Sequence, residues 1–268
     1  MPSDETAIPS IVRECLHHLA DQYTRALSDN LVGIYVHGSI AMGCFNPDSS
    51  DVDVLVVARA PLSLETKREL GAHHLDLAKY CAPPVELSVV LKAVLDRFVY
   101  PPPYEFHFSN EHLSAFEDGA VDFAAGDTDP DLAAHFVITK QVGITLVGEP
   151  AQEIFPEVPH AHYLDSLARD AEWCAAGVID GPDEGECRVP PYAVLNYCRV
   201  LAYIVDREVT SKRTGGQWAL ARLPGHFHAV MRAALDEYSG ARPAQPVPCK
   251  TLKEFAVYAL GRIRGASG

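Results

Sequence analysis

The sequence predicts an α+β protein in which an N-terminal half of mixed strands and helices is followed by an all-helical C-terminal half. Short β-branched runs alternate with helical segments up to about residue 110, and segments with helical periodicity dominate beyond it. The 268 residues are enough for two modest domains, each with its own core. We expect a first domain over 1–150 and a second over 151–268, with the boundary between residues 110 and 160.

The N-terminal half begins with a predicted helix. Ser10 can cap it, and apolar residues then recur at helical spacing on one face, at Ile11, Cys15, Leu16, Leu19, Tyr23 and Leu27. A second helix is expected over 63–80. Apolar and β-branched runs predict four strands, at 31–37, 51–57, 85–91 and 104–108. The unbroken apolar tail of 51–57 indicates a strand that is buried on both faces.

The C-terminal half is predicted to be helical throughout. Helical periodicity indicates five segments, at 130–147, 161–177, 190–206, 225–239 and 250–264. Glycine- and proline-rich stretches at 148–150, 181–186 and 241–249 separate them.

Composition indicates a cytoplasmic protein. Apolar residues make up 48% of the chain and charged residues 22%, as in ordinary globular proteins, and no apolar run is long enough to cross a bilayer. The polar, acidic N-terminus lacks the layout of a secretory signal. The seven cysteines are scattered, so we expect reduced, buried thiols. The twelve histidines show no spacing typical of a zinc site.

The net charge of −14 restricts the partners. A protein that binds a nucleic-acid backbone needs a basic surface, so a nucleic-acid partner is not expected. An acidic protein attracts cations, and it still binds ATP when magnesium shields the phosphates. We therefore expect a small cationic second substrate.

The most informative segment begins at His37-Gly38-Ser39, where the first predicted strand ends. The missing side chain of Gly38 allows a phosphate to approach the backbone. Ser39 is expected to open a helix, so that its amide and hydroxyl face an anion with the helix dipole behind them. Taken alone, this pair is also consistent with an ordinary turn.

Asp51 and Asp53 open the second predicted strand and project from one face of it. Two carboxylates on an apolar strand favour a bound cation, and Mg²⁺ prefers such oxygen ligands while sharing them with substrate phosphates. The alternative is a solvated strand entrance. Because the Gly-Ser turn lies twelve residues before this pair, the two motifs together favour phosphoryl transfer.

Glu86 is a third acidic candidate, since it is a lone carboxylate in the apolar strand 85–91. It has two possible roles in a site of this kind: it completes a metal site, or it accepts the proton of an incoming hydroxyl, with burial raising its pKa. A glutamate on the wet face of an outer strand is an equally good interpretation.

The Gly-Ser, D-x-D and strand-borne glutamate set resembles the polymerase-β-type nucleotidyltransferase fold. The stretch HGSIAMGCFNP followed by SSDVDVLVV resembles the aminoglycoside O-adenylyltransferases of the streptomycin/spectinomycin type. Residues 192–223 and the LVGEP turn at 146–150 are similar to the same family, so the likeness covers most of 30–240.

The resemblance implies a role for each matching residue. Ser39 and Ser50 would hold the ATP triphosphate beside Gly38, Asp51 and Asp53 would bind two magnesium ions, and Glu86 would be the catalytic base at the metal site. The C-terminal domain would complete the nucleotide and acceptor sites. There, Arg199 and Lys212 would contact phosphates and Tyr238 would lie near the nucleotide, and cations of these two types suit a polyphosphate.

The departures from the family concern the acceptor. A family tryptophan is replaced by Ser109-Asn110-Glu111-His112, and the loop over 180–186 is longer but still acidic. We expect Trp173 to pack against a helix rather than line the drug site. The implied function is transfer of AMP from ATP to a hydroxyl of an aminocyclitol antibiotic, which gives resistance. Adenylylation of a protein or another metabolite, or nucleotide binding without catalysis, are the alternatives.

Overall fold

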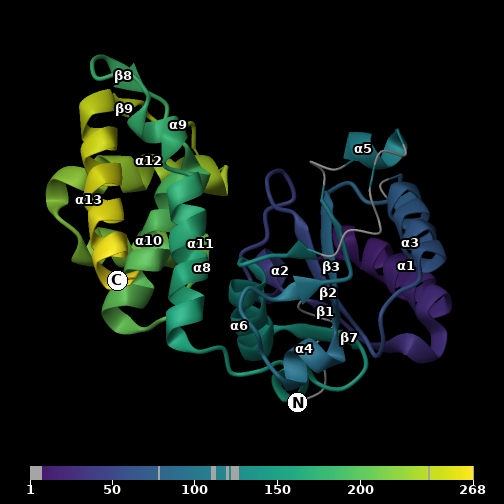
Figure 1. The fold of residues 1–268 in the computed structure, drawn as a ribbon. Helices are drawn as coiled ribbons and strands as arrows, with labels where there is room; N and C mark the ends of the chain where they lie inside the picture. The colour runs from purple at the N-terminus through teal and green to yellow at the C-terminus, as the bar shows by residue number, and fades with distance from the viewer. Residues whose placement is uncertain are drawn as a thin grey trace. The chain divides into compact units, whose positions relative to one another are not determined.

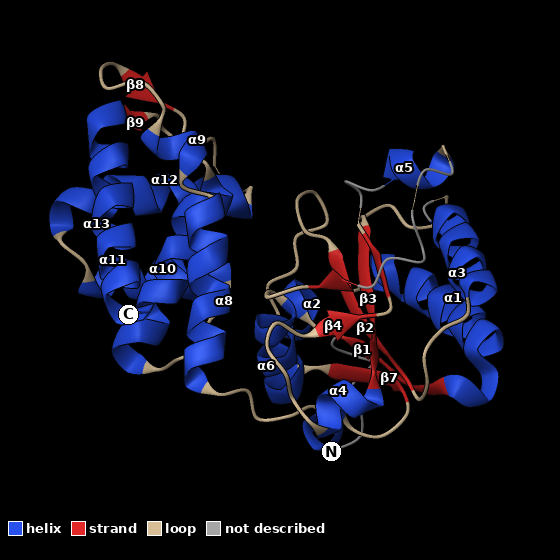
Figure 2. Ribbon diagram, viewed as in Figure 1, coloured by secondary structure: helices blue, strands red, loops and turns tan. Residues whose placement is uncertain are grey.

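The computed structural model describes residues 8–77, 79–109, 113–118, 121, 127–240 and 242–267. It separates into two compact units, Met1–Val158 and Pro159–Gly268 (Figure 1). Each unit is considered by itself. The first unit is α/β and the second is helical, as the sequence predicts (Figure 2).

A mixed five-stranded sheet forms the centre of the first unit. Its strands lie in the order β5 (Phe106–Phe108), β3 (Val85–Leu91), β2 (Val52–Ala58), β1 (Leu31–Val36) and β7 (Ile144–Val147). Only β2 and β3 are parallel, and the other neighbouring pairs are antiparallel. The predictions for β1, β2 and β3 are therefore confirmed to within one residue at each end, because their apolar runs are unbroken.

Helices cover both faces of this sheet (Figure 2). One face packs against α1 (Ser10–Leu27) and α3 (Leu64–Leu77). The other face packs against α4 (Lys92–Asp96), α6 (Leu132–Val142) and α7 (Ala151–Ile154). Alternate residues of β2 enter the two cores, so the prediction that this strand is buried on both faces is confirmed.

The start of α1 differs from the prediction. The helix begins at Ser10 itself, and Pro9 at the N-cap position makes no side-chain capping bond, so Ser10 is not the cap. Ile11 is 51% exposed and Val12 is buried in its place. The first turn is thus rotated by one residue from the expected face.

The predicted strand over 104–108 is divided between two sheets. β4 (Pro103–Tyr104) pairs with β6 (Asp127–Thr128), whereas β5 joins the central sheet. Glu105 lies at the bend, where its carboxylate accepts a hydrogen bond from the amide of Leu62 and lies 3.6 Å from the ammonium group of Lys67. These contacts hold the bend, and they link residues too far apart to be inferred from periodicity.

The predicted helix over 130–147 is also too long. The helix α6 ends at Val142, and after Gly143 the four residues Ile144–Val147 form β7 beside β1. At Gly143 a side chain would lie 2.4 Å from the carbonyl oxygen of Thr139, so only glycine permits this close turn. The prediction extended the helical periodicity of 130–142 over Ile144–Val147, although these four residues include β-branched side chains typical of a strand.

The second unit consists of helices around α10 (Pro191–Asp206), whose inner face is buried. The other helices are α8 (His160–Trp173), α9 (Ala176–Ile179), α11 (Lys212–Arg222), α12 (His228–Ser239) and α13 (Cys249–Ser267). The strands β8 (Glu186–Cys187) and β9 (Val247–Pro248) form a short antiparallel pair. The helix α11 was not predicted, because its polar first half contains Gly215 and Gly216. Among the helices that the structure describes, none is long and apolar enough to cross a membrane.

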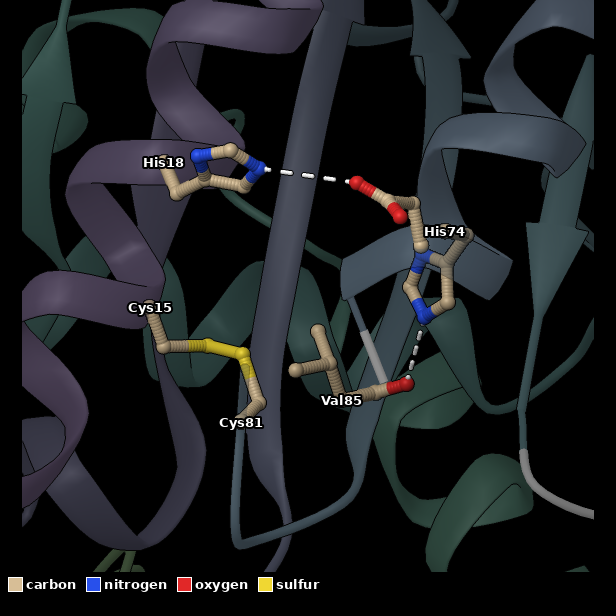
Figure 3. Close-up of a disulfide and its surroundings, with 6 residues drawn as sticks. Cys15, His18, His74, Cys81 and Val85 are labelled. Atoms are coloured by element: carbon tan, nitrogen blue, oxygen red, sulfur yellow. Dashed lines mark hydrogen bonds and ion pairs between the residues drawn. A yellow bond between two sulfur atoms is a disulfide. The ribbon is translucent and has the colours of Figure 1, made fainter. Parts of the chain in front are cut away.

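Two disulfides contradict the expectation that the cysteines are reduced. Cys15 of α1 is bonded to Cys81, close to the start of β3 (Figure 3), and Cys187 is bonded to Cys249. The partners are 66 and 62 residues apart in the sequence, so only the tertiary fold brings them together. The other cysteines are thiols, as expected: Cys44, Cys174 and Cys198. Because disulfides persist mainly in oxidising compartments, the cytoplasmic location stays a prediction.

Candidate active site

The candidate acids come together at one end of the parallel pair β2 and β3. Asp53 lies directly opposite Glu86 in the register, and both side chains are half-buried. Asp51 precedes β2 and is exposed. The parallel pairing explains this arrangement, because two strands that enter the sheet from the same edge bring their first residues side by side.

The turn at Gly38 lies against Asp53. The amide of His37 donates a 3.0 Å hydrogen bond to the carbonyl oxygen of Asp53, and Gly38 has a positive φ of 58°. A Cβ atom at Gly38 would lie 1.7 Å from Oδ2 of Asp53. The missing side chain therefore makes room for this carboxylate, and the two motifs of the sequence lie next to each other.

Ser39 lies in α2 (Gly38–Ala41), a single helical turn. The predicted helix is therefore too short for a helix dipole to contribute much to anion binding. Within the described residues, the buried hydroxyl oxygen of Ser39 has no hydrogen-bond partner. A buried hydroxyl without a partner costs free energy, and a phosphate oxygen would supply the missing acceptor.

Ser50 is buried and closes the turn that leads to Asp51. Its hydroxyl oxygen accepts a 3.0 Å hydrogen bond from the amide of Asn46, and its own amide donates a 2.8 Å bond to the carbonyl of Asn46. The observed contact of the Ser50 hydroxyl is thus with the turn itself. A role in holding phosphate stays a prediction.

The electrostatics of the cluster centre on Glu86. Burial raises its pKa, His135 lowers it, and the carboxylates of Asp53, Asp131 and Asp51 raise it further, to about 7. These interactions join groups from β2, β3 and α6 in one electrostatic cluster. A carboxyl group whose pKa lies near neutrality is suited to accept and release a proton.

Two residues of this cluster were not singled out in the sequence: His135 of α6 and Asp131, which directly precedes that helix. The Nε2 atom of His135 lies 3.2 Å from a carboxylate oxygen of Asp131. Burial alone would lower the pKa of His135, but Asp131, Glu86 and Asp53 outweigh it and raise the pKa to about 10. The neighbouring carboxylates therefore favour the protonated, cationic form of His135. Its ring lies 4.7 Å from that of the buried His37, whose pKa is lowered well below 6.5, first by burial and then by His135.

The donor atoms fit Mg²⁺ only in part. Among the described residues, no three histidine, cysteine, aspartate or glutamate side chains are arranged to hold a metal ion. Mg²⁺ is usually held by one or two carboxylates together with waters and substrate phosphates. Asp53, with Asp51 beside it in the sequence, supplies a donor set of that kind, and the nucleotide would have to supply the remaining ligands.

The three candidates of the C-terminal half lie in the second unit. Arg199 lies on α10, Lys212 begins α11, and Tyr238 is half-buried near the end of α12. A Cβ atom at Gly215 would lie 2.8 Å from Cα of Arg199, so α11 packs closely against α10 at this point. The Nζ atom of Lys212 lies 3.9 Å from the ring centroid of Tyr192.

Trp173 contradicts the packing expected for it. Its side chain is 72% exposed, and its ring meets that of Tyr192 edge to face at 6.4 Å. Trp173 is the last residue of α8, where the helix no longer covers the side chain. The acidic residues of the 180–186 loop are exposed, and one of them, Asp183, is paired with Lys253. Of the departure at 109–112, positions 110–112 lie outside the described residues.

Comparison with known proteins agrees with this geometry. Residues 21–116 match the model of a nucleotidyltransferase domain, and residues 153–262 match the model of the aminoglycoside adenylyltransferase C-terminal domain. An aminoglycoside (3'') (9) adenylyltransferase from Klebsiella pneumoniae is 26% identical over 91% of this chain and 92% of its own length. A spectinomycin 9-adenylyltransferase from Campylobacter jejuni is 23% identical over 80% of each chain.

The fold is shared with a solved structure. The spectinomycin adenyltransferase AAD(9) from Enterococcus faecialis, determined with ATP and spectinomycin, superimposes with a TM-score of 0.76 at 19% sequence identity. The match covers 94% of this chain and 98% of that one. Both halves of the sequence, and the fold that they form, therefore match the same group of proteins. The chain belongs to the aminoglycoside adenylyltransferase family of nucleotidyltransferases.

Proposed function

We propose that this enzyme transfers AMP from ATP to a hydroxyl of an aminocyclitol antibiotic of the spectinomycin or streptomycin type. One observation carries the proposal: the Asp53 carboxylate lies against Gly38, and Asp53 pairs with Glu86 in the sheet. The residue expected to bind metal therefore lies next to both the expected phosphate-binding turn and the expected base. The names of the relatives point to the same reaction. Transfer of AMP would inactivate the drug and so give resistance.

We assign the nucleotide's phosphates to the turn and the metal to the acids. Ser39 and Ser50 hold the triphosphate of ATP, and Gly38 allows its approach. Asp51 and Asp53 would hold two magnesium ions next to Glu86, with waters and the nucleotide supplying the other ligands. When bound, the ions would supply positive charge to offset the charge that develops on the phosphates.

Glu86 acts as the general base. Its carboxylate takes the proton of the acceptor hydroxyl while the hydroxyl oxygen attacks the α-phosphorus of ATP, and pyrophosphate leaves from the opposite side. One P–O bond forms and one breaks, and the proton goes to Glu86. The raised pKa of Glu86, about 7, suits this task, because such a base is deprotonated near neutral pH yet still basic. His135 offsets the negative charge of the cluster before ATP binds.

The remaining candidate residues belong to the second unit. We assign Arg199 and Lys212 to the phosphates and Tyr238 to the neighbourhood of the nucleotide. A guanidinium group and an ammonium group suit a polyphosphate. The net charge of −14 and the exposed acids of the 180–186 loop favour a cationic acceptor over a polyanion.

The test is an adenylylation assay of the full chain with Mg·ATP. Spectinomycin, streptomycin and a protein lysate are offered as acceptors, and the products are analysed by mass spectrometry. We expect the mass of AMP to be added to an antibiotic, with loss of turnover in Glu86→Gln and Asp53→Asn. Labelling of lysate proteins alone would assign a different acceptor. Binding of ATP without pyrophosphate release with any acceptor would contradict the enzymatic proposal.

A further inference from the structure

Asp170, on α8, is a carboxylate that accepts hydrogen bonds on both of its oxygens. Its side chain is 13% exposed. Oδ2 accepts a 2.6 Å bond from the side-chain amide of Asn196 and a 3.5 Å bond from Nη2 of Arg199. Oδ1 accepts a 3.3 Å bond from the hydroxyl of Tyr192 and a weak bond from the thiol of Cys174. No motif of the sequence marks this residue.

The contacts around Arg199 form a closed ring. The Nε atom of Arg199 donates a 2.5 Å bond to the side-chain oxygen of Asn196, whose amide in turn donates to Asp170. Asn196 is fully buried. A guanidinium group that is held at two of its nitrogens has a fixed plane. The close approach of Gly215 fixes the backbone at the same residue.

Asp170 is also linked to Lys212, through Tyr192. The hydroxyl of Tyr192 donates to Asp170, and the ammonium group of Lys212 stacks on the ring of Tyr192 at 3.9 Å. A cation over an aromatic ring is attracted by the ring quadrupole, so the position of the ring guides that of the ammonium group. Asp170 thus contacts Arg199 directly and Lys212 through Tyr192.

We propose that Asp170 is a positioning residue that orients Arg199 and Lys212 for the phosphates of ATP. The inference rests on the proposed function, because that function supplies the phosphates. Asp170 is a single carboxylate, so it does not by itself offset the positive charge of both Arg199 and Lys212. Long cationic side chains lose rotamer freedom when they bind, and ordering them in advance removes part of that cost.

The test is a double-mutant cycle on the affinity of the full chain for Mg·ATP, measured by isothermal titration calorimetry. We expect Asp170→Asn to raise the Kd about tenfold, because a charge-assisted hydrogen bond to Arg199 is lost. In an Arg199→Ala background the same substitution should change the Kd less than about twofold, because the contact with Arg199 is already gone and the new amide oxygen can still accept the hydrogen bond from Tyr192. The matched control is Asp165→Asn, also on α8, whose carboxylate pairs with Arg169 on the surface; it should leave the Kd unchanged.

The outcomes separate the inference from the proposed function. An effect of Asp170→Asn that persists undiminished without Arg199 would show a structural role and overturn the inference. An unchanged Kd in Asp170→Asn, together with a raised Kd in Arg199→Ala, would also overturn the inference but would leave the proposed function standing. An unchanged Kd in Arg199→Ala would overturn both the inference and the phosphate role of Arg199. Should Asp170→Asn not fold, the cycle with Asp170→Glu, which keeps the charge, is interpreted in the same way, with a smaller expected loss.

Discussion

The contact between Gly38 and Asp53 gives the sharpest prediction about the site. Replacing Gly38 with alanine has two costs. The positive φ of 58° is unfavourable for any residue with a side chain, at about 1 kcal/mol. In addition, the new methyl group would lie 1.7 Å from Oδ2 of Asp53, so the carboxylate must move by more than about 1 Å to reach van der Waals distance.

Gly43 offers a matched control in the same loop. Its φ is 66°, but a Cβ atom there would meet nothing within 4 Å. Gly43→Ala should therefore share the cost in stability, about 1 kcal/mol, without disturbing Asp53. A displacement of about 1 Å at a reacting group costs about a hundredfold in rate. We expect Gly38→Ala to lose at least that factor in kcat/KM.

The assay is steady-state pyrophosphate release, together with urea unfolding of both variants. Gly43→Ala should lose about 1 kcal/mol of the free energy of unfolding, and Gly38→Ala at least as much. Only Gly38→Ala should lose activity. Near-normal activity in Gly38→Ala would refute the reasoning, because Asp53 would then tolerate displacement. Equal losses of activity in the two variants would refute it too, since backbone strain alone would explain them.

Three further predictions follow from burial, charge and the disulfides. Because the pKa of Glu86 is raised to about 7 and its deprotonated form is the base, kcat/KM should fall about tenfold per pH unit below pH 7; a profile flat down to pH 5 would exclude Glu86 as the base. Burial lowers the pKa of His74 to about 4, although a hydrogen bond with the carbonyl group of Val85 acts in the opposite direction (Figure 3). The neutral ring therefore contributes stability above pH 6.5, and this contribution is lost as the pH falls toward 4. Between pH 7.5 and pH 5 the free energy of unfolding should fall by about 2 kcal/mol more in the unsubstituted protein than in His74→Gln. Urea unfolding at each pH measures it, and an equal fall in the two proteins would contradict this prediction. Replacing Cys15 and Cys81 with serine opens a loop with a sequence separation of 66, which should lower the free energy of unfolding of the first unit by about 4 kcal/mol. Removing the second disulfide should leave that transition in place, and an equal shift from both pairs would contradict the assignment of each disulfide to one unit.

Much of the fold was predictable because burial leaves a local pattern. The strand over Val85–Leu91 was predicted with both ends correct, and Val52–Ala58 was shifted by one residue, because each is an unbroken apolar run. The pattern failed where long-range contacts decide the structure. The four residues of β7 were assigned to a helix, because their strand character depends on pairing with β1.

The arrangement of the candidate site residues was predictable only in part. From the sequence, a place for Glu86 on a solvent-exposed strand face was as good an interpretation as a place in the active site. The register of β2 against β3 decides between the two, and it cannot be inferred from either strand alone. His135 and Asp131 were missed, since a histidine four residues after an aspartate is common on helices. Only the fold shows that their helix brings positive charge to the carboxylates.

The central claim is that the acids at 51, 53 and 86 hold divalent ions against the phosphates of ATP beside the Gly38 turn. Binding of Mn²⁺ in place of Mg²⁺, counted by electron paramagnetic resonance with a non-hydrolysable ATP analogue, tests this most directly. We predict two ions per chain in the presence of the nucleotide, and fewer in Asp53→Asn. Binding of the nucleotide without any Mn²⁺ would contradict the claim, and so would two bound ions in both the unsubstituted protein and Asp53→Asn.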